Sequence, residues 1–270
     1  MITFATKRMG KTSTIRCFDL RYSRAHDSHA GNTFDNPSPG VRKLTSTMDT
    51  FRDRLEQVME RIRGAAEGAG RSPESVSLLA VSKFHPIEAL QEAIECGITS
   101  FAENYVQEAA QKSASLPRAS FAMIGPLQRN KAKPALQCCT AIMTLDRPEL
   151  ASRLTKLAEE LDLKRDVWIQ IDLWGEESKM GGCGPDGVRP IVDALGGSSS
   201  LALRGFMAIP PMGLSSAFGE LTIFREEWQQ RLGKKLLLSM GMSDDLEEAI
   251  KAGSDQVRVG TALFGSRARG

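Results

Sequence analysis

The amino-acid sequence predicts a single-domain α/β protein built around one closed parallel sheet. Short apolar runs alternate with amphipathic helical patterns along the chain, which is typical of parallel strands covered by helices. Eight such runs occur, at residues 77–82, 100–102, 119–125, 141–145, 167–173, 201–209, 235–240 and 256–264. Helical patterns lie between most of them, for example at 87–96, 148–161, 188–195, 218–232 and 244–252. Eight strand–helix units in a stretch of this length favour a (β/α)8 barrel, also called a TIM barrel.

One further helix is expected before the first strand. Apolar side chains recur at helical spacing from Phe51 to Ile62, with charged side chains between them. Thr50 and Asp53 have the spacing of a capping pair at the start of this helix. Glycines and a proline at 68–73 end the pattern.

Residues 1–47 differ in composition from the rest of the chain. They hold eight Lys/Arg and three Asp, a net charge of +5, and they contain no Glu. Without sustained apolar periodicity, such a segment does not bury enough surface to order itself. We expect a disordered tail or an upstream start chosen in error before Met48, with a targeting segment as the alternative. The folded domain then spans residues 48–270.

The composition of this domain excludes several classes of function. It carries 27 basic and 30 acidic residues, a net charge of −3, which argues against a nucleic-acid groove. No apolar run approaches the roughly 20 residues of a membrane span. The five cysteines of the chain form no CxxC pair and its three histidines complete no zinc pattern. We therefore expect reduced thiols in a cytoplasmic protein, with no metal, nucleic acid or membrane as a partner.

Lys83 follows the first apolar run directly. The run ends in Ser-Lys-Phe-His at 82–85, where an open doubly wound sheet would carry a Gly-rich dinucleotide loop. A lysine held at an apolar strand end loses hydration, so its pKa falls and its amine becomes nucleophilic toward an aldehyde. These are the requirements of a Schiff-base lysine. The alternative is a lysine that has already emerged into solvent at the barrel rim.

The last two apolar runs end in small residues that suit a phosphate group. Gly260 and Thr261 lie in the eighth run and its turn, while Ser239 and Gly241 lie at the end of the seventh run and directly after it. Helix N-termini preceded by small residues bind phosphate, and barrels often build phosphate sites from the loops after strands seven and eight. The alternative is a pair of tight turns with a helix N-cap at residue 243 or 244.

Six blocks of the sequence, in order between Met48 and Arg267, resemble the family of pyridoxal phosphate homeostasis proteins. The blocks are AVSK (80–83), FAENYVQE (101–108), IGPLQRNK (124–131), RGFMAIP (204–210), LSMGMSDD (238–245) and VRVGTALFG (257–265). The resemblance implies a barrel of fold type III among proteins that use pyridoxal 5′-phosphate (PLP), related to the N-terminal domain of alanine racemase. It also implies that PLP is the cofactor.

The predicted cofactor site comprises eight residues: Lys83, Asn104, Met207, Ser239, Gly241, Arg258, Gly260 and Thr261. By resemblance, Lys83 forms the internal aldimine with PLP. The phosphate is expected to be held by Ser239, Gly260 and Thr261.

The remaining side chains are expected around the ring. Arg258 would face the pyridine nitrogen, Asn104 would lie near the ring face or its hydroxyl, and Met207 would line the pocket. For Asn130 and Lys131 in the third block, two interpretations remain open. They either act directly in the site, or Asn130 caps a short helix and Lys131 is a surface charge.

Two features favour a PLP holder over an enzyme. Arg258 stays charged at physiological pH, which would leave the pyridine nitrogen unprotonated and the ring a weak electron sink. By resemblance, alanine racemase also works with an arginine, so this feature alone does not exclude racemisation. In the related racemases, a tyrosine from a separate C-terminal domain supplies the second acid/base, and this chain stops five residues after Gly265. We expect a monomer that holds PLP for PLP-dependent apo-enzymes. The alternatives are a PLP-dependent amino-acid racemase and an interaction protein with an empty barrel.

The chain departs from the family pattern after its fifth apolar run. Asp172 stands where the family commonly has Asn, whereas the Glu-Ser-Lys at 177–179 is retained. The tract at 180–184 follows the family pattern less closely than expected. It is interpreted as a flexible loop at the mouth of the barrel. A reactive thiol at Cys183 is the alternative.

Overall fold

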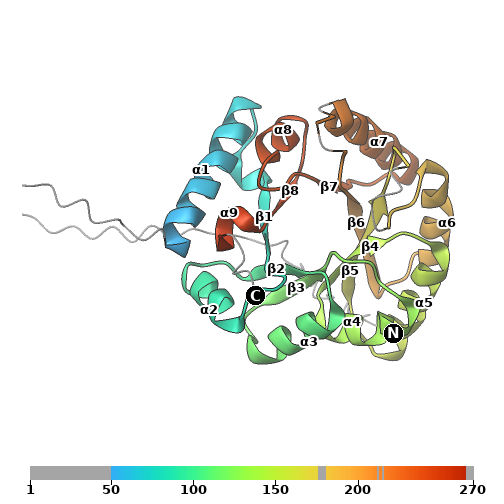
Figure 1. Ribbon diagram of the computed structural model, residues 1–270. Helices are drawn as coiled ribbons and strands as arrows, with labels where there is room; N and C mark the ends of the chain where they lie inside the picture. The colour runs from blue at the N-terminus through green and yellow to red at the C-terminus, as the bar shows by residue number, and fades with distance from the viewer. Residues whose placement is uncertain (1–49, 176–180, 212, 215, 266–270) are drawn as a thin grey trace, which may run out of the picture.

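The computed structural model describes residues 50–175, 181–211, 213–214 and 216–265. Eight parallel strands pair in chain order and close into a barrel, and the helices surround it (Figure 1). The strands are β1 (Ser77–Val81), β2 (Ser100–Glu103), β3 (Ser120–Met123), β4 (Ala141–Leu145), β5 (Arg165–Ile171), β6 (Leu201–Ala208), β7 (Leu237–Ser239) and β8 (Gln256–Val259). The predicted (β/α)8 barrel is confirmed, while the expectation for residues 1–47 lies outside the described residues.

The helices alternate with these strands. They are α1 (Phe51–Gly68), α2 (Ile87–Glu95), α3 (Val106–Ser115), α4 (Ala132–Cys138), α5 (Pro148–Glu160), α6 (Pro185–Leu195), α7 (Ser216–Leu232), α8 (Leu246–Lys251) and α9 (Thr261–Phe264), with short 3-10 turns at Pro73–Ser75 and Arg129–Lys131. No helix in the described ranges is long and apolar enough to cross a membrane.

The first helix lies against the end of the chain's last barrel unit. The predicted capping box of Thr50 and Asp53 is present, with each side chain accepting from the other residue's backbone N–H. Helix α1 lies beside α8 and α9 (Figure 1), and the rings of Phe51 and Phe264 pack 5.3 Å apart. Burial of this apolar face, rather than helix propensity alone, stabilises α1.

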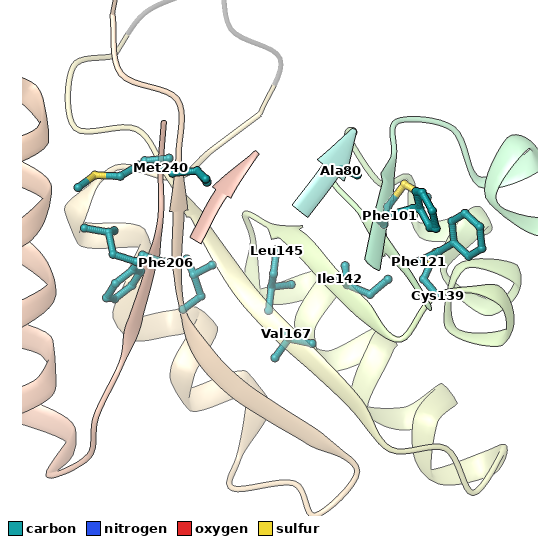
Figure 2. Packing of buried hydrophobic residues seen from close by; sticks show 14 of the residues in the cluster. Ala80, Phe101, Phe121, Cys139, Ile142, Leu145, Val167, Phe206 and Met240 are labelled. Carbon is teal, nitrogen blue, oxygen red and sulfur yellow. The ribbon is translucent and has the colours of Figure 1, made fainter. Parts of the chain in front are cut away.

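Alternation along the strands divides the core into two layers. Side chains such as Phe101, Phe121 and Phe206 pack outward against the helices in one large cluster (Figure 2). The alternate positions face into the barrel and form a second, smaller cluster, in which Met207 and Trp168 are buried. The barrel interior is therefore filled with side chains, as it is in other (β/α)8 proteins.

The structure corrects several predicted boundaries. Strand β8 ends at Val259, and the residues that we expected to extend it form α9. Strand β1 ends at Val81, so that Lys83 lies in the following turn. Helix α8 begins at Leu246, which places its N-cap at residue 245 rather than 243 or 244. Helices α3 and α4 were not predicted.

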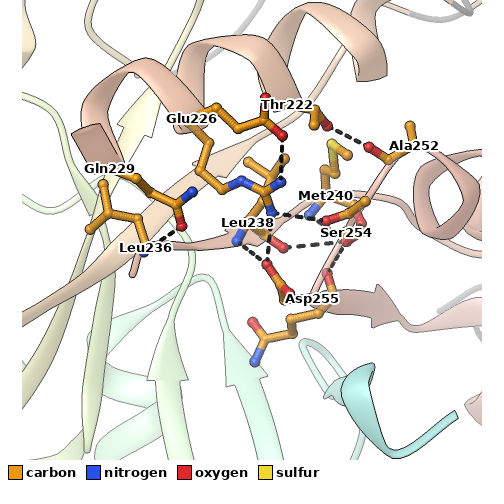
Figure 3. A network of polar contacts seen from close by, with 12 residues as sticks. Thr222, Glu226, Gln229, Leu236, Leu238, Met240, Ala252, Ser254 and Asp255 are labelled. Carbon is orange, nitrogen blue, oxygen red and sulfur yellow. Dashed lines mark hydrogen bonds and ion pairs between the residues drawn. The ribbon is translucent and has the colours of Figure 1, made fainter. Parts of the chain in front are cut away.

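The seam between β7 and β8 depends on side chains. Ser239 and Gln256 are the one register pair recorded between these short strands. The Asp255 carboxylate accepts from the Leu238 N–H at 2.9 Å and from the Arg225 guanidinium at 3.2 Å. The Ser254 hydroxyl lies 2.8 Å from the Met240 carbonyl (Figure 3). These contacts tie β7 to the segment that enters β8, next to the predicted phosphate loops.

We predict that Asp255→Ala lowers the free energy of unfolding by about 3 kcal/mol, because a buried N–H and a nearly buried guanidinium lose their acceptor. Urea unfolding followed by circular dichroism measures the effect. The control is Asp193→Ala, which removes an exposed ion pair to Arg189 and should change stability by less than about 1 kcal/mol. Equal losses in the two variants would contradict the proposed role of the seam.

Candidate functional site

All eight predicted site residues lie at or just beyond the carboxyl ends of strands β1, β2, β6, β7 and β8. Because the sheet is closed, these five strands are consecutive around the barrel, in the order β6, β7, β8, β1 and β2. In barrels of this class the carboxyl ends of the strands form the functional face. The predicted residues therefore share one end of the barrel, which is called the mouth below.

Lys83 lies in the turn after β1. Leu79, four residues earlier, lies in the inner layer, and Val81 packs against it. The side chain is half-buried. Phe84 follows with a φ of 65°, a left-handed conformation that a bulky residue rarely adopts. The chain therefore turns sharply immediately after the lysine.

The turn that contains Lys83 meets the last barrel unit. The rings of His85 and Phe264 stack with centroids 4.7 Å apart, which places the turn against α9. Below this contact, Gly260 lies against Val81, and a Cβ at position 260 would lie 3.3 Å from the Val81 carbonyl oxygen. Barrel closure thus brings Lys83 and the predicted phosphate loop to neighbouring strand ends.

Arg258 braces three strand ends from inside the barrel. Its guanidinium donates to the Ser239 carbonyl oxygen at 2.7 Å, to the Ser239 hydroxyl at 2.9 Å and to the Ala208 carbonyl oxygen at 2.8 Å. Burial lowers the pKa of Arg258 to about 10. The side chain therefore remains a cation at neutral pH, surrounded by the ends of β6, β7 and β8.

Ser239 and Met207 lie beside this guanidinium. Ser239 is fully buried, and its hydroxyl donates to Gln256 Oε1 at 3.0 Å while it accepts from Arg258. Met207 is the register partner of Ser239 and is buried in the inner layer. The structure thus brings Arg258, Ser239 and Met207 together. It also engages the Ser239 hydroxyl in protein contacts, which the sequence did not indicate.

The loops after β7 and β8 are joined, as their small residues suggested. Thr261 is exposed at the first position of α9, and the next N–H, that of Ala262, donates to the Ser243 hydroxyl at 3.4 Å. Gly241 has a φ of 92°, and a Cβ there would lie 2.5 Å from the Cβ of Ala249. Close packing against α8 therefore explains this glycine, and its phosphate role stays a prediction.

Asn104 carries an unsatisfied polar atom at the mouth. Its Oδ1 is buried and has no hydrogen-bond partner within the described part of the chain. The backbone of Asn104 is pressed against Gly125 beyond β3, where a Cβ would lie 2.1 Å from the Asn104 carbonyl oxygen. A buried oxygen of this kind normally has a donor, so its presence is consistent with a ligand that supplies one.

A buried ionic cluster beneath Lys83 was missed by the sequence interpretation. The Lys112 ammonium lies 2.7 Å from each of three acceptors, namely the Ser82 carbonyl oxygen, Glu103 Oε1 and Glu108 Oε1. Burial raises the pKa of Glu103, and the bonds from Lys112 and Ser82 oppose that shift. The available signal was a glutamate that ends an otherwise apolar strand, at position 103.

The region after β5 is more ordered where it is described than we expected. Cys183 forms a β-bridge with Ile171, and burial, with the charge of Asp146, raises the pKa of its thiol to about 12. The thiol is therefore buried at a β-bridge, which argues against a reactive thiol, whereas the flexible loop at 180–184 stays a prediction because residue 180 lies outside the described residues. Asp172 Oδ1 accepts from the N–H groups of Trp174 and Gly175. The motif at 177–179 lies outside the described residues.

The third block does not contain the expected helix cap. Asn130 is exposed and lies inside the 3-10 turn Arg129–Lys131. The N-cap of this turn is Gln128, whose side chain makes no capping hydrogen bond. Lys131 is half-buried and precedes α4.

Comparisons with known proteins agree with this geometry. The family model described as the N-terminal domain of alanine racemase matches residues 52–268. The pyridoxal phosphate homeostasis protein of Pseudomonas aeruginosa is 41% identical over 224 residues, which cover 82% of this chain and 97% of that protein. Alanine racemase of Clostridium difficile shares the fold with a TM-score of 0.67 at 16% identity, and the match covers 82% of this chain and 58% of the racemase.

A solved structure of PipY from Synechococcus elongatus with PLP bound matches with a TM-score of 0.70 and 34% identity, covering 80% of this chain and 100% of PipY. The fold, the alignment along nearly the whole length of these relatives and the family model all lead to one assignment. The chain belongs to the family of pyridoxal phosphate homeostasis proteins, which are built on the barrel named after the N-terminal domain of alanine racemase.

Proposed function

We propose that this protein binds PLP covalently through Lys83 and serves PLP homeostasis by holding the cofactor rather than by turning over a substrate. The observation that carries the proposal is the position of Lys83, which is half-buried in the turn after β1, two residues beyond the Val81 that lies against Gly260. The PLP-bound relative and the family assignment support the choice of aldehyde.

The residues at the mouth fit the chemical groups of PLP. Thr261 is exposed at a helix start, and the adjacent Gly260 has no side chain to obstruct a phosphate. Arg258 supplies a buried cation for the ring nitrogen. Its guanidinium has five N–H donors and makes three hydrogen bonds to Ser239 and Ala208. The buried Asn104 Oδ1 can accept from the ring hydroxyl. Ser239 is proposed to hold the phosphate together with Gly260 and Thr261, although in the structure its hydroxyl bonds to Arg258 and Gln256.

PLP supplies an aldehyde, and a lysine amine that attacks it forms a carbon–nitrogen double bond and releases one water molecule. Lys83 would provide that amine. Arg258 keeps its positive charge and therefore does not transfer a proton to the pyridine nitrogen. Without that proton the ring withdraws electrons only weakly, which favours reversible storage over bond cleavage at a bound amino acid.

The surroundings of the site support exchange of the cofactor. Lys83 is half-buried and Thr261 is exposed, so water reaches both proposed attachment points. We propose that the holder is a monomer in the cytoplasm and passes PLP to PLP-dependent apo-enzymes. The described cysteines are free thiols, which suits a reducing compartment. Size-exclusion chromatography tests the monomer, and reactivation of an apo-enzyme by the loaded protein tests the transfer.

We predict that Lys83→Ala abolishes covalent attachment of PLP and leaves the fold intact, because residue 83 lies in a turn outside the packed strands. Borohydride reduction followed by peptide mapping detects the attachment, and thermal unfolding of the ligand-free protein reports the fold. The control, Lys133→Ala, changes an exposed lysine on α4 and should retain full attachment. Undiminished labelling of the Lys83→Ala variant would overturn the assignment.

Thr261→Ala should raise the dissociation constant for PLP about tenfold, the expected loss for one hydrogen bond to a charged group. Covalent attachment at saturating PLP should persist. Titration of the absorbance of the bound cofactor measures this change. The matched control is Thr99→Ala, since Thr99 is exposed at the other end of the barrel, before β2. If affinity were unchanged in both variants, the phosphate would bind elsewhere.

Amino-acid turnover separates a holder from a racemase. We predict that the PLP-loaded protein racemises L-alanine no faster than free PLP at the same concentration, because the ring is weakly activated. Chiral chromatography after prolonged incubation provides the measurement, with heat-denatured protein as the control. Rapid turnover that disappears in Lys83→Ala would favour the racemase instead.

A further inference from the structure

Both peptide groups that flank Lys83 are anchored to helix α3 by a buried ionic cluster. The cluster, called the Lys112 cluster here, consists of Ser82, Glu103, Glu108 and Lys112. The Ser82 carbonyl oxygen, just before Lys83, accepts from the Lys112 ammonium at 2.7 Å. The Phe84 N–H, just after it, donates to Glu108 Oε1 at 2.7 Å. The backbone on each side of the lysine is therefore fixed to the same helix.

The Lys112 ammonium is fully paired within the cluster, while the buried Glu103 Oε2 has no hydrogen-bond partner in the described part of the chain. An ammonium group has three donors, and the three acceptors at 2.7 Å use all of them. The Lys112 side chain is 4% exposed and that of Glu103 is 0% exposed. The Ser82 hydroxyl adds a bond of 2.6 Å to Glu103 Oε1. Two bonds of this set, from Lys112 to the Ser82 carbonyl oxygen and from the Ser82 hydroxyl to Glu103, hold the residue directly before Lys83.

General stability does not account for such an arrangement. Buried ion pairs often contribute less to stability than apolar side chains of the same volume, because both charges lose their hydration. A packed apolar cluster would close this part of the barrel equally well. What the ionic cluster adds is a defined geometry, because each hydrogen bond fixes a direction as well as a distance.

The conformation of Phe84 shows where this geometry is needed. Its φ of 65° is unfavourable for a bulky residue, and such strain persists only when the surroundings enforce it. Two bonds hold the chain in this conformation: the Phe84 N–H donates to Glu108 Oε1, and the His85 N–H donates to the Ser82 carbonyl oxygen at 3.0 Å across the turn. The Phe84 ring itself is 56% exposed, so burial of the side chain does not explain the strained backbone.

We propose that Glu108 and Lys112 are positioning residues that preset the direction of the Lys83 amine toward the PLP aldehyde. This inference rests on the proposed function. By anchoring the peptide groups on both sides of Lys83, the cluster would reduce the number of directions that its side chain samples before it attacks. The expected consequence is faster covalent attachment, with little effect on the contacts to the ring and phosphate.

The test compares two ligands in Glu108→Ala, with Glu88→Ala as the matched control. PLP reports attachment by Lys83. Pyridoxine 5′-phosphate has the same ring and phosphate but an alcohol in place of the aldehyde, so it reports binding alone. Glu108 is 21% exposed and its truncation leaves Glu103 paired with Lys112, so the variant is expected to fold. Glu88 and Glu108 both line a surface cleft of about 410 Å³, together with Phe84.

The expected result is a rate constant for covalent attachment at least tenfold lower in Glu108→Ala, with affinity for pyridoxine 5′-phosphate within twofold of the parent protein. Glu88→Ala should match the parent in both measurements. Glu108→Gln should restore most of the rate, because its amide oxygen can replace the Oε1 that accepts from Phe84 and Lys112.

Other outcomes would overturn the inference. An unchanged rate in Glu108→Ala would show that the cluster does not position Lys83. Equal losses for both ligands would reduce the cluster to a structural support of the whole mouth. Absence of attachment in the parent protein would instead refute the proposed function, and this inference with it.

Discussion

Closure of the sheet is the constraint on which the site depends. Strand β1 pairs with β8 at four positions, from Ser77 opposite Gln256 to Ala80 opposite Val259. This pairing places the end of the first strand beside the end of the last. Without it, Lys83 and Thr261 would be separated by most of the chain, and no local feature of either segment would bring them together. At the contact of Gly260 with Val81, the pairing that closes the barrel also joins the two segments of the candidate site.

Arg258 links closure to the chemistry of the mouth. A buried guanidinium is costly unless its donors are satisfied. Its bonds to Ser239 and Ala208 satisfy them while joining the ends of three adjacent strands. The same cation therefore contributes to structure and, under the proposed function, would set the electronic character of the cofactor ring. A substitution that altered the second property would also disturb the first, which gives this residue little freedom to change.

Much of the fold was predictable because eight repeated units leave a strong periodic signal. The strand ends then indicated the mouth, since barrels place their functional residues there.

Helix α3 was missed because its segment alternates small and polar residues, and it contributes little more than Val106 and Ala109 to the apolar core. The Lys112 cluster was missed for a related reason. Glu108 and Lys112 have the i, i+4 spacing of an ordinary exposed pair, and only packing against Ser82 reveals that the lysine is buried. In the same way, the burial of Cys183 depends on its bridge to β5, which local sequence does not encode.

The pairing of the first strand with the last also has a consequence for synthesis of the protein. A chain still emerging from the ribosome contains Lys83 long before it contains Arg258 or the α9 turn. Contacts between such distant segments form late, because the loop between them must first be closed. A nascent chain would therefore expose its lysine without the groups expected to hold the rest of the cofactor. Under the proposed function, retention of PLP would begin only after the segment from Arg258 to α9 has joined the barrel.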